Sequence, residues 1–299
     1  MKISALVPWF GSKRTLAPAV VRLLGPHRCY WEPFCGSMAV LLAKPAAAYE
    51  SVNDLHGDLV NLARVLQLRE TAEALHDRAY RTLFAEDLCK EGKEVLARPW
   101  EPDGRPDIDR AYWYLVFSWF HLNGLAGTRL NQKGSFCVRY SSKGGNGAVR
   151  WRGVVDSIPD WHERLLRVQI TCRDGLGLLA GIEDREGTVV YADPPYLKEG
   201  GRYVHSFSPS QHEELARQLR RFLRTRVVVS YYDDPRLAGL YPGWEKIEPA
   251  SLNVAKSMVK CGMRDRSGRI TAPEVLLVNR PAAAQPGLFA GDANANCRL

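Results

Sequence analysis

A strand that is followed by two prolines constrains the fold of this chain more than any other feature. Residues 188–196 read TVVYADPPY. The β-branched residues favour a buried strand, which must end at Asp193 because Pro194 and Pro195 have no backbone N–H to continue the ladder. A proline also holds the residue before it extended, which leaves the Pro194 carbonyl free. The segment therefore predicts a stiff turn that carries a carboxylate, a carbonyl and the ring of Tyr196.

The expected place of this turn is beside a ligand crevice. In an open α/β sheet, ligands bind at the carboxyl ends of the strands. The Asp193 carboxylate, the Pro194 carbonyl and the Tyr196 ring together suit a planar heterocycle that bears an amino group. The simpler alternative is a strand that ends in prolines and a surface tyrosine.

Composition indicates a globular protein with a polyanionic partner. The chain has 299 residues, 25% of them charged and 45% hydrophobic, with a formal net charge of +8. That length can hold one large or two ordinary domains, and a basic balance is typical of nucleic-acid binding. The seven cysteines form no C-x-x-C pair, so we expect neither a disulfide framework nor a zinc site, as in a reducing cytoplasm. No signal peptide or long apolar run stands out, so we expect neither secretion nor a membrane span.

The N-terminal quarter predicts half of a nucleoside-binding unit. Residues 7–13 form a turn with an exposed indole, and residues 16–24 have the spacing of an amphipathic helix. A strand then leads through Glu32 into a turn at Gly36 and a helix over 39–43, and the glycine would let the backbone approach a ligand. A second strand, over 48–53, ends at Asp54, roughly 20 residues after the glycine, where a ribose is usually held. An ordinary turn between a strand and a helix is the alternative.

The segment 55–164 interrupts the α/β alternation and predicts an inserted, mainly helical domain. Its stretch 122–155 contains no acidic residue. Six cations and three aromatic rings are interleaved there, which suits contacts with phosphates and stacked bases. They are Arg129, Lys133, Arg139, Lys143, Arg150 and Arg152, with Phe136, Tyr140 and Trp151. A solvated basic face is the alternative.

The α/β pattern resumes at a strand over 168–172, with Asp174 just behind it. A loop over 200–208 could close over the site, and Ser210 with Glu213 predicts a capping box for a helix that runs to Leu223. Further strands are expected over 226–230, 244–248 and 274–279. The fold class is thus α/β, a doubly wound Rossmann-like sheet that is mostly parallel with an antiparallel last strand. The histidines have no metal-ligand spacing, so no metal is expected.

The motifs in this order resemble the Dam-type DNA adenine-N6 methyltransferases. They are 9–13, 32–36, Asn53 with Asp54, Asp174 and 193–196. The resemblance covers about 1–57 and 165–280. It implies that S-adenosylmethionine is surrounded by Trp9, Lys13, Phe34, Gly36, Asp54, Asp174 and Asp193. It also implies that the insertion recognises the target, with DNA contacts from Asn123, Leu125 and Arg129.

This resemblance defines the expected domains and reaction. A methyltransferase domain would comprise 1–57 and 165–281, a target-recognition domain 58–164, and a flexible tail 282–299. Asp193 and Pro194 would accept hydrogen bonds from N6 of an adenine flipped out of double-stranded DNA, while Tyr196 stacks on its ring. Lys133, Arg139 and Lys143 would contact the DNA backbone. A prokaryotic or phage-encoded protein in the cytoplasm, acting as a monomer, is expected.

Several alternatives remain open at this point. The family usually carries a second glycine two residues after the first, where this chain has Met38, so a DNA-binding protein with a degenerate cofactor site is one alternative. The turn also serves cytosine N4 or a glutamine amide, and RNA is a further substrate class. The recognition sequence, and whether a restriction endonuclease accompanies the enzyme, stay undetermined.

The tail contains one apolar pair in an otherwise polar segment. Residues 285–289 read QPGLF, and this pentapeptide resembles the Q-x-x-L-F motif that docks on the bacterial sliding clamp, although Pro286 is unusual in it. Gln285, Leu288 and Phe289 would make the contacts. A hydrophobic pair that folds back on the parent domain is the alternative.

Overall fold

A mostly parallel β-sheet forms the centre of the computed structural model, which describes residues 4–9, 11–102, 104–121, 136, 146–197, 205–249, 262–264 and 270–279. The sheet order is β3-β2-β1-β4-β5-β8-β6, with β7 paired to β8. The strands are β1 (Cys29–Glu32), β2 (Tyr49–Asn53), β3 (Val168–Thr171), β4 (Thr188–Ala192), β5 (Arg226–Tyr232), β6 (Glu245–Ile247), β7 (Gly262–Arg264) and β8 (Ile270–Val278). Neighbouring strands within the run β3-β2-β1-β4-β5 are parallel. β8 pairs antiparallel with both β5 and β6. The antiparallel last strand is thereby confirmed.

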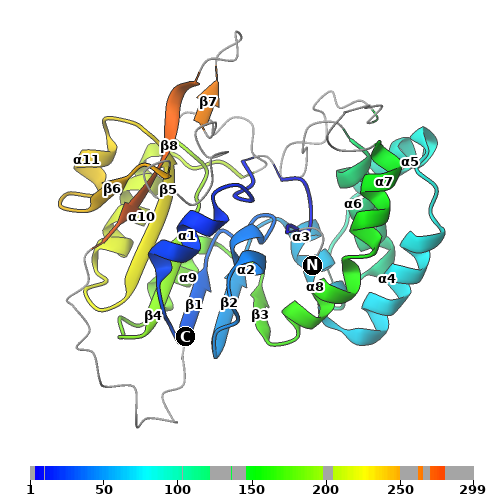
Figure 1. Ribbon diagram of the computed structural model, residues 1–299, viewed down its shortest axis with the longest axis horizontal. Helices are drawn as coiled ribbons and strands as arrows, with labels where there is room; N and C mark the ends of the chain where they lie inside the picture. The colour runs from blue at the N-terminus through cyan, green and yellow to red at the C-terminus, as the bar shows by residue number, and fades with distance from the viewer. Residues whose placement is uncertain are drawn as a thin grey trace.

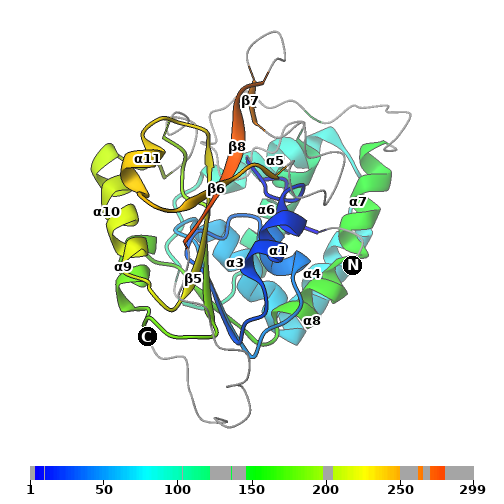
Figure 2. The same ribbon diagram turned by 60° about the vertical axis from the view of Figure 1, so that its left-hand side comes forward.

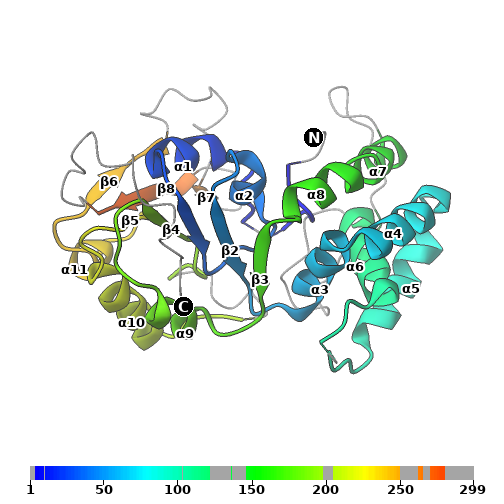
Figure 3. The ribbon, with the colours of Figure 1, turned by 90° about the horizontal axis from the view of Figure 1, so that it is seen from below.

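Helices cover both faces of the sheet (Figure 3). On one face lie α1 (Ala17–Leu24) and α2 (Ala39–Ala43), and on the other α9 (Gly175–Gly181), α10 (Pro209–Arg220) and α11 (Leu237–Leu240). Successive residues of β4 alternate between them: Val189 and Tyr191 join the core under α1, and Val190 and Ala192 join the core under α9. A strand buried on both faces reads as a continuous apolar run, which explains why β4 was readable from the sequence. The predicted doubly wound α/β fold is confirmed.

The insertion between β2 and β3 is helical in the part that the structure describes (Figure 1). It contains α3 (Gly57–Gln67), α4 (Arg69–Arg81), α5 (Glu86–Ala97), α6 (Ile108–Phe120), α7 (Gly147–Val155) and α8 (Ile158–Leu165). Every residue of α6 from Arg110 to Phe120 is buried, because α3, α4, α5 and α7 surround this helix. The Trp119 indole N–H donates to the Leu6 carbonyl at 2.9 Å, and one hydrophobic core runs from α1 into the insertion. The insertion is therefore packed against the sheet domain.

β8 extends beyond β5 and pairs there with β7 (Figure 2). Its register places Glu274 opposite Tyr232, the last residue of β5. An antiparallel strand thus brings a mid-strand residue to the edge of the sheet where the parallel strands end.

Three local expectations were wrong. The capping box of α10 consists of Ser208 and Gln211, two residues before the predicted pair, because Pro209 favours the first helical position, where no backbone N–H is needed. The helix ends at Arg220, so Leu223 lies outside it and is 70% exposed. Cys29 is disulfide-bonded, which the scattered cysteines did not predict.

Several predicted residues lie outside the described ranges. These are Asn123, Leu125, Arg129, Lys133, Arg139, Lys143, Gln285, Leu288 and Phe289. Phe136, from the basic segment, is described: it forms an antiparallel bridge with His121 and its ring lies 4.8 Å from that of Phe84. Among the described helices, none has the length and apolarity to cross a bilayer.

Candidate active site

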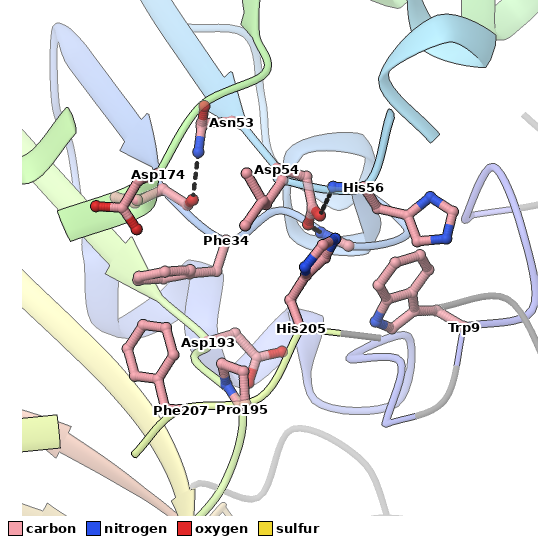
Figure 4. Close-up of a pocket in the computed structure, with 14 residues that line it drawn as sticks. Trp9, Phe34, Asn53, Asp54, His56, Asp174, Asp193, Pro195, His205 and Phe207 are labelled. Carbon is pink, nitrogen blue, oxygen red and sulfur yellow. Dashed lines mark hydrogen bonds between the residues drawn. The ribbon is translucent and has the colours of Figure 1, made fainter. Parts of the chain in front are cut away.

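A cavity lies where β1, β2, β3 and β4 end (Figure 4). Its empty volume, with open solvent at its mouth included, is about 650 Å³. It lies at the point where the chain order of the sheet reverses between β1 and β4, the usual ligand site of such folds. The lining residues are Trp9, Pro33, Phe34, Gly36, Asn53, Asp54, Leu55, His56, Asp174, Gly175, Asp193, Pro195, His205 and Phe207.

The turn after β1 holds Asp54 in a defined orientation. The Gly36 N–H donates to Asp54 Oδ2 at 2.8 Å and the His56 N–H to Oδ1 at 2.9 Å. Gly36 has φ +45°, and a Cβ there would lie 3.0 Å from the Trp9 indole nitrogen. Only glycine fits both the dihedral angle and the space. Each oxygen of Asp54 keeps acceptor capacity towards the cavity, as binding of a ribose diol requires.

Two rings form one wall of the cavity. Phe34 and Phe207 meet edge to face with their centroids 5.5 Å apart. A Cβ on Gly175 would lie 2.4 Å from the Phe34 ring, so the ring rests directly on the first residue of α9. Asp174 caps that helix by accepting from the Gly177 N–H at 2.8 Å. An acceptor next to a pair of rings suits a planar base with an exocyclic amino group.

Asn53 connects the ends of β1, β2 and β3 behind the cavity. Its amide group donates to the carbonyls of Pro33 at 3.0 Å and Arg173 at 2.9 Å. Its oxygen accepts from the Thr171 hydroxyl at 2.8 Å and the Arg173 N–H at 3.1 Å. Asn53 is 1% exposed, and it thereby holds the turns that carry Phe34 and Asp174 at a constant separation.

Asp193 is held from two sides at the end of β4. The Ser230 hydroxyl donates to Oδ1 at 2.7 Å, and the Lys13 ammonium lies 2.9 Å from Oδ2. Lys13 also lies 3.1 Å from Glu274 Oε1, to which the Tyr196 hydroxyl donates at 2.5 Å. Burial raises the pKa of Asp193, with Lys13 acting to lower it, Glu274 to raise it and Ser230 to lower it. Lys13 and Ser230 therefore favour the ionised carboxylate against desolvation.

The predicted site residues divide into two groups. Trp9, Phe34, Gly36, Asp54, Asp174 and Asp193 line the cavity, as the sequence predicted for cofactor contacts. Lys13 does not line it and instead pairs with Asp193. Pro194 and Tyr196 are also absent from the lining, and Pro195 stands there in their place. None of the described residues donates a hydrogen bond to the Pro194 carbonyl.

The ring of Tyr196 is enclosed by protein. It is 4% exposed, with the Tyr232 ring 4.5 Å away and the Lys13 ammonium 5.0 Å from its centroid. An incoming base can therefore stack on this ring only if its neighbours move.

Glu32 and Met38 lie behind the cavity. Burial raises the pKa of Glu32 to about 8, and its carboxylate accepts from the Tyr30 hydroxyl at 2.8 Å. Met38 has φ +57°, the left-handed region that favours glycine, yet its side chain is fully buried in the core under α1. The side chain therefore takes no space from the cavity, and Met38 gives no structural reason for a degenerate cofactor site.

Sequence reasoning missed the residues that come from outside the motifs. His56, His205 and Phe207 line the cavity, and Ser230 and Glu274 contact the turn over residues 193–196. His56 follows Asp54 directly and could have been found by extending that motif. Ser230 lies within β5 and Glu274 within β8, where only the sheet order reveals their proximity.

Comparisons with known proteins agree with this geometry. The model of the D12 class N6 adenine-specific DNA methyltransferases matches residues 9–248. The DNA adenine methylase of Vibrio cholerae is 25% identical over 289 residues, 94% of this chain and 97% of the relative. The Retron Ec67 DNA adenine methylase of Escherichia coli is 27% identical over 243 residues, 80% of this chain and 81% of the relative.

Among solved structures, SMU.472, described as a methyltransferase complexed with SAH, aligns with 71% of this chain and 57% of its own. The identity is 12% and the TM-score 0.24, too low to support an argument about fold or ligand. The family model covers most of the chain and includes the glycine turn, Asp54, Asp174 and Asp193. This chain belongs to the D12 class N6 adenine-specific DNA methyltransferases.

Proposed function

We propose that this DNA adenine methyltransferase transfers a methyl group from S-adenosylmethionine to N6 of an adenine flipped out of double-stranded DNA. The observation that carries the proposal is the position of Asp193. Its carboxylate lines the cavity and is oriented by Ser230 and Lys13. The neighbouring Pro194 carbonyl accepts no hydrogen bond from the described residues. Two acceptors on one rigid turn match the two hydrogens of an amino group.

The cavity fits the proposed cofactor. Asp54 would accept from the ribose hydroxyls, Asp174 from the adenine amino group, and Phe34 with Phe207 would contact the adenine ring. The absence of a Cβ at Gly36 and Gly175 leaves the room that Trp9 and Phe34 occupy along the walls. When bound, S-adenosylmethionine would supply a methyl group on a sulfonium, which leaves as a neutral thioether.

The residues of the chain would activate the amino group. The lone pair of adenine N6 is delocalised into the ring, and acceptors at Asp193 and Pro194 would draw the group towards a tetrahedral geometry. As N6 donates its pair to the methyl carbon, positive charge develops on N6, and the nearby carboxylate stabilises it. N6 then loses one proton to solvent, which leaves a neutral methylated base. Lys13 supports this role because it keeps Asp193 ionised in a buried site.

The target base would have to leave the duplex. N6 of a paired adenine cannot be approached in line by a methyl donor, so extrusion into the cavity is required. Tyr196 remains our candidate for stacking on the base. With its ring 4% exposed, stacking would accompany a rearrangement of Tyr232 or Lys13 on DNA binding.

We also propose a division of labour in the rest of the chain. The sheet domain (1–57 and 165–281) would carry the chemistry, and the insertion (58–164) would recognise DNA through Asn123, Leu125, Arg129, Lys133, Arg139 and Lys143. Arg129 is our candidate for reading a base, and the others would neutralise phosphates. Cytosine N4, or adenine in RNA, is the substrate alternative, because the turn and a basic segment serve these as well.

Three further proposals concern the cellular setting. We propose a monomer in a prokaryotic cytoplasm, whether the enzyme acts alone or with a restriction endonuclease. The tail (282–299) would be flexible and would dock on a sliding clamp through Gln285, Leu288 and Phe289. A peptide of residues 280–299 that fails to bind purified clamp at tens of micromolar ends the docking proposal.

Substitution of Asp193 tests the mechanism. We expect Asp193→Ala to abolish methyl transfer and to leave DNA affinity within about twofold, since the carboxylate contacts no phosphate. Asp193→Asn should also lose about 100-fold or more in rate, because an amide carries no full charge. The measurements are mass spectrometry of nucleosides from methylated duplex DNA and a DNA-binding titration. Asp233→Asn is the matched control, because this aspartate follows the neighbouring strand β5 and pairs with Lys246 instead. Turnover in Asp193→Asn equal to that of the control would contradict the mechanism.

A further inference from the structure

Glu274 contacts the proposed catalytic turn (residues 193–196) and lies in a strand that the family model does not cover. The match ends at residue 248, whereas Glu274 lies in β8. Its Oε1 accepts from the Tyr196 hydroxyl at 2.5 Å and lies 3.1 Å from the Lys13 ammonium. The same ammonium lies 2.9 Å from Asp193 Oδ2. Two carboxylates thus share one cation, and one of them belongs to the residue proposed to activate the amino group.

The cluster is buried, so its charges act strongly on one another. Lys13 is 6% exposed, Glu274 is 9% exposed and the Asp193 side chain is 20% exposed. With both carboxylates ionised and Lys13 protonated, the cluster carries one net negative charge. Little solvent remains to screen that charge, so each group influences the ionisation of the others.

The titratable and polar groups around Asp193 come from every neighbouring element. Lys13 comes from the N-terminal turn, Glu32 from β1, Tyr191 from β4, Tyr196 from the catalytic turn, Ser230 from β5 and Glu274 from β8. Glu32 and the tyrosines are neutral near pH 7, since burial raises the pKa of Glu32 to about 8 and the pKa of Tyr191 and Tyr196 well above 10. The charge balance at Asp193 is therefore decided by Lys13 and Glu274.

We propose that Glu274 is a positioning residue for methyl transfer: it holds the Lys13 ammonium and the Tyr196 hydroxyl at one oxygen, and so keeps Lys13 against Asp193 and the Asp193 carboxylate aimed into the cavity. This inference rests on the proposed function of Asp193. Glu274 itself does not line the cavity and acts through Lys13 and Tyr196.

The shared cation predicts opposite effects of two neutral substitutions. In Glu274→Gln the amide oxygen can still accept from Tyr196, but the negative charge is gone, so protonation of Asp193 needs a lower pH. In Lys13→Met the two carboxylates face each other without a cation, so Asp193 takes up its proton at a higher pH. The acidic limb of the rate profile should therefore move down in the first variant and up in the second.

The experiment is a pH profile of the single-turnover methylation rate, at saturating duplex DNA and S-adenosylmethionine. For Glu274→Gln we expect the acidic limb to move by roughly half a pH unit or more to lower pH, with a plateau reduced on the order of tenfold through loss of charge-assisted hydrogen bonds. Tyr196→Phe should lower the plateau and leave the limb in place. Glu245→Gln is the control, because this exposed glutamate lies on the adjacent strand β6, opposite Val278 rather than near Tyr232.

The outcomes separate the two proposals. Wild-type protein that transfers no methyl group to DNA adenine refutes the proposed function itself. An active wild type with the acidic limb of Glu274→Gln at the position of Glu245→Gln refutes the role of Glu274. If Glu274→Gln fails to fold, Glu274→Asp tests the same inference, because it keeps the negative charge but shortens the side chain by one methylene. We expect this variant to have a lower plateau rate than wild type and an acidic limb at the same pH. A plateau equal to that of wild type would contradict the inference.

Discussion

Substitution of Gly175 tests whether Phe34 forms the wall of the cofactor site, because the Phe34 ring occupies the space that a side chain at position 175 would need. A Cβ at this position would lie 2.4 Å from Phe34 Cε1 and 2.8 Å from Cζ, whereas carbon atoms in contact prefer about 3.5–4.0 Å. The ring edge must therefore move by about 1 Å in Gly175→Ala. Figure 4 shows the Phe34 ring between Asp174, which precedes Gly175, and Phe207. We therefore expect the displaced ring to move towards Phe207.

The displacement of the Phe34 ring should lower the affinity for the cofactor more than it lowers the stability of the fold. Phe34 is only half-buried, so its ring can yield at a cost to stability of about 1 kcal/mol, the lower end for overpacking. In Gly175→Ala, the moved ring would no longer contact the adenine ring of S-adenosylmethionine in the same way. We expect the binding free energy to weaken by about 1.4–2.8 kcal/mol, which corresponds to a 10- to 100-fold higher Kd.

Titration calorimetry with S-adenosylmethionine, together with thermal denaturation, measures both effects. Gly177→Ala is the matched control on the same helix, since its Cβ would meet only the Asp174 carboxylate at 3.5 Å, an ordinary contact. Equal cofactor affinities in the two variants would show that Phe34 does not form the cofactor wall.

Two further predictions concern the residues behind the cavity. Met38→Gly relieves a left-handed strain of about 1 kcal/mol but leaves a core cavity that costs about 2–5 kcal/mol, so chemical denaturation should show a net loss of roughly 1–4 kcal/mol; a stabilised variant would show that the strain outweighs the packing. Glu32 has a pKa raised from 4.5 to about 8 by burial, so the folded state binds more protons than the unfolded chain in that window and stability falls as pH rises through it. Glu32→Gln should remove this decline, as measured by urea denaturation at several pH values, and a slope equal to that of wild type would contradict the assignment.

The strands and the cavity-lining motifs could be predicted because their signals are local. β4 is an apolar run that is followed by Asp193 and two prolines. Asp54 follows the end of β2 directly, and Asp174 lies three residues after the end of β3. Parallel strands bring such positions to one edge of a sheet whatever the details of packing. Of the residues for which these signals predict cofactor contacts, all but Lys13 line one cavity.

The start of α10 shows how a local signal can also mislead. Ser208 precedes the helix, whereas Ser210 is its second residue. Ser210 is followed three residues later by a glutamate, as a capping box requires. Ser208 caps instead because Pro209 occupies the first helical position and Gln211 completes the box. The proline, with its restricted φ and missing N–H, outweighs the better match of the glutamate.

The charge environment of Asp193 could not be predicted, because it depends on a strand that runs in the opposite direction. Residues that follow the carboxyl ends of parallel strands can be expected at the ligand edge of the sheet. This expectation does not apply to β8, because β8 is antiparallel to β5. Its register sets Glu274 opposite Tyr232 and Leu276 opposite Ser230, so the residue that meets the turn over 193–196 is the first residue of β8 that pairs with β5. In a sheet of this order, the residue to examine is the one at which the antiparallel strand begins to pair with β5. A charged side chain there can influence the ionisation of the group at the end of β4. Such a residue reads in sequence as a charge next to an apolar strand, as Glu274 does before Val275, and its proximity to Lys13 emerges only from the pairing of the two strands.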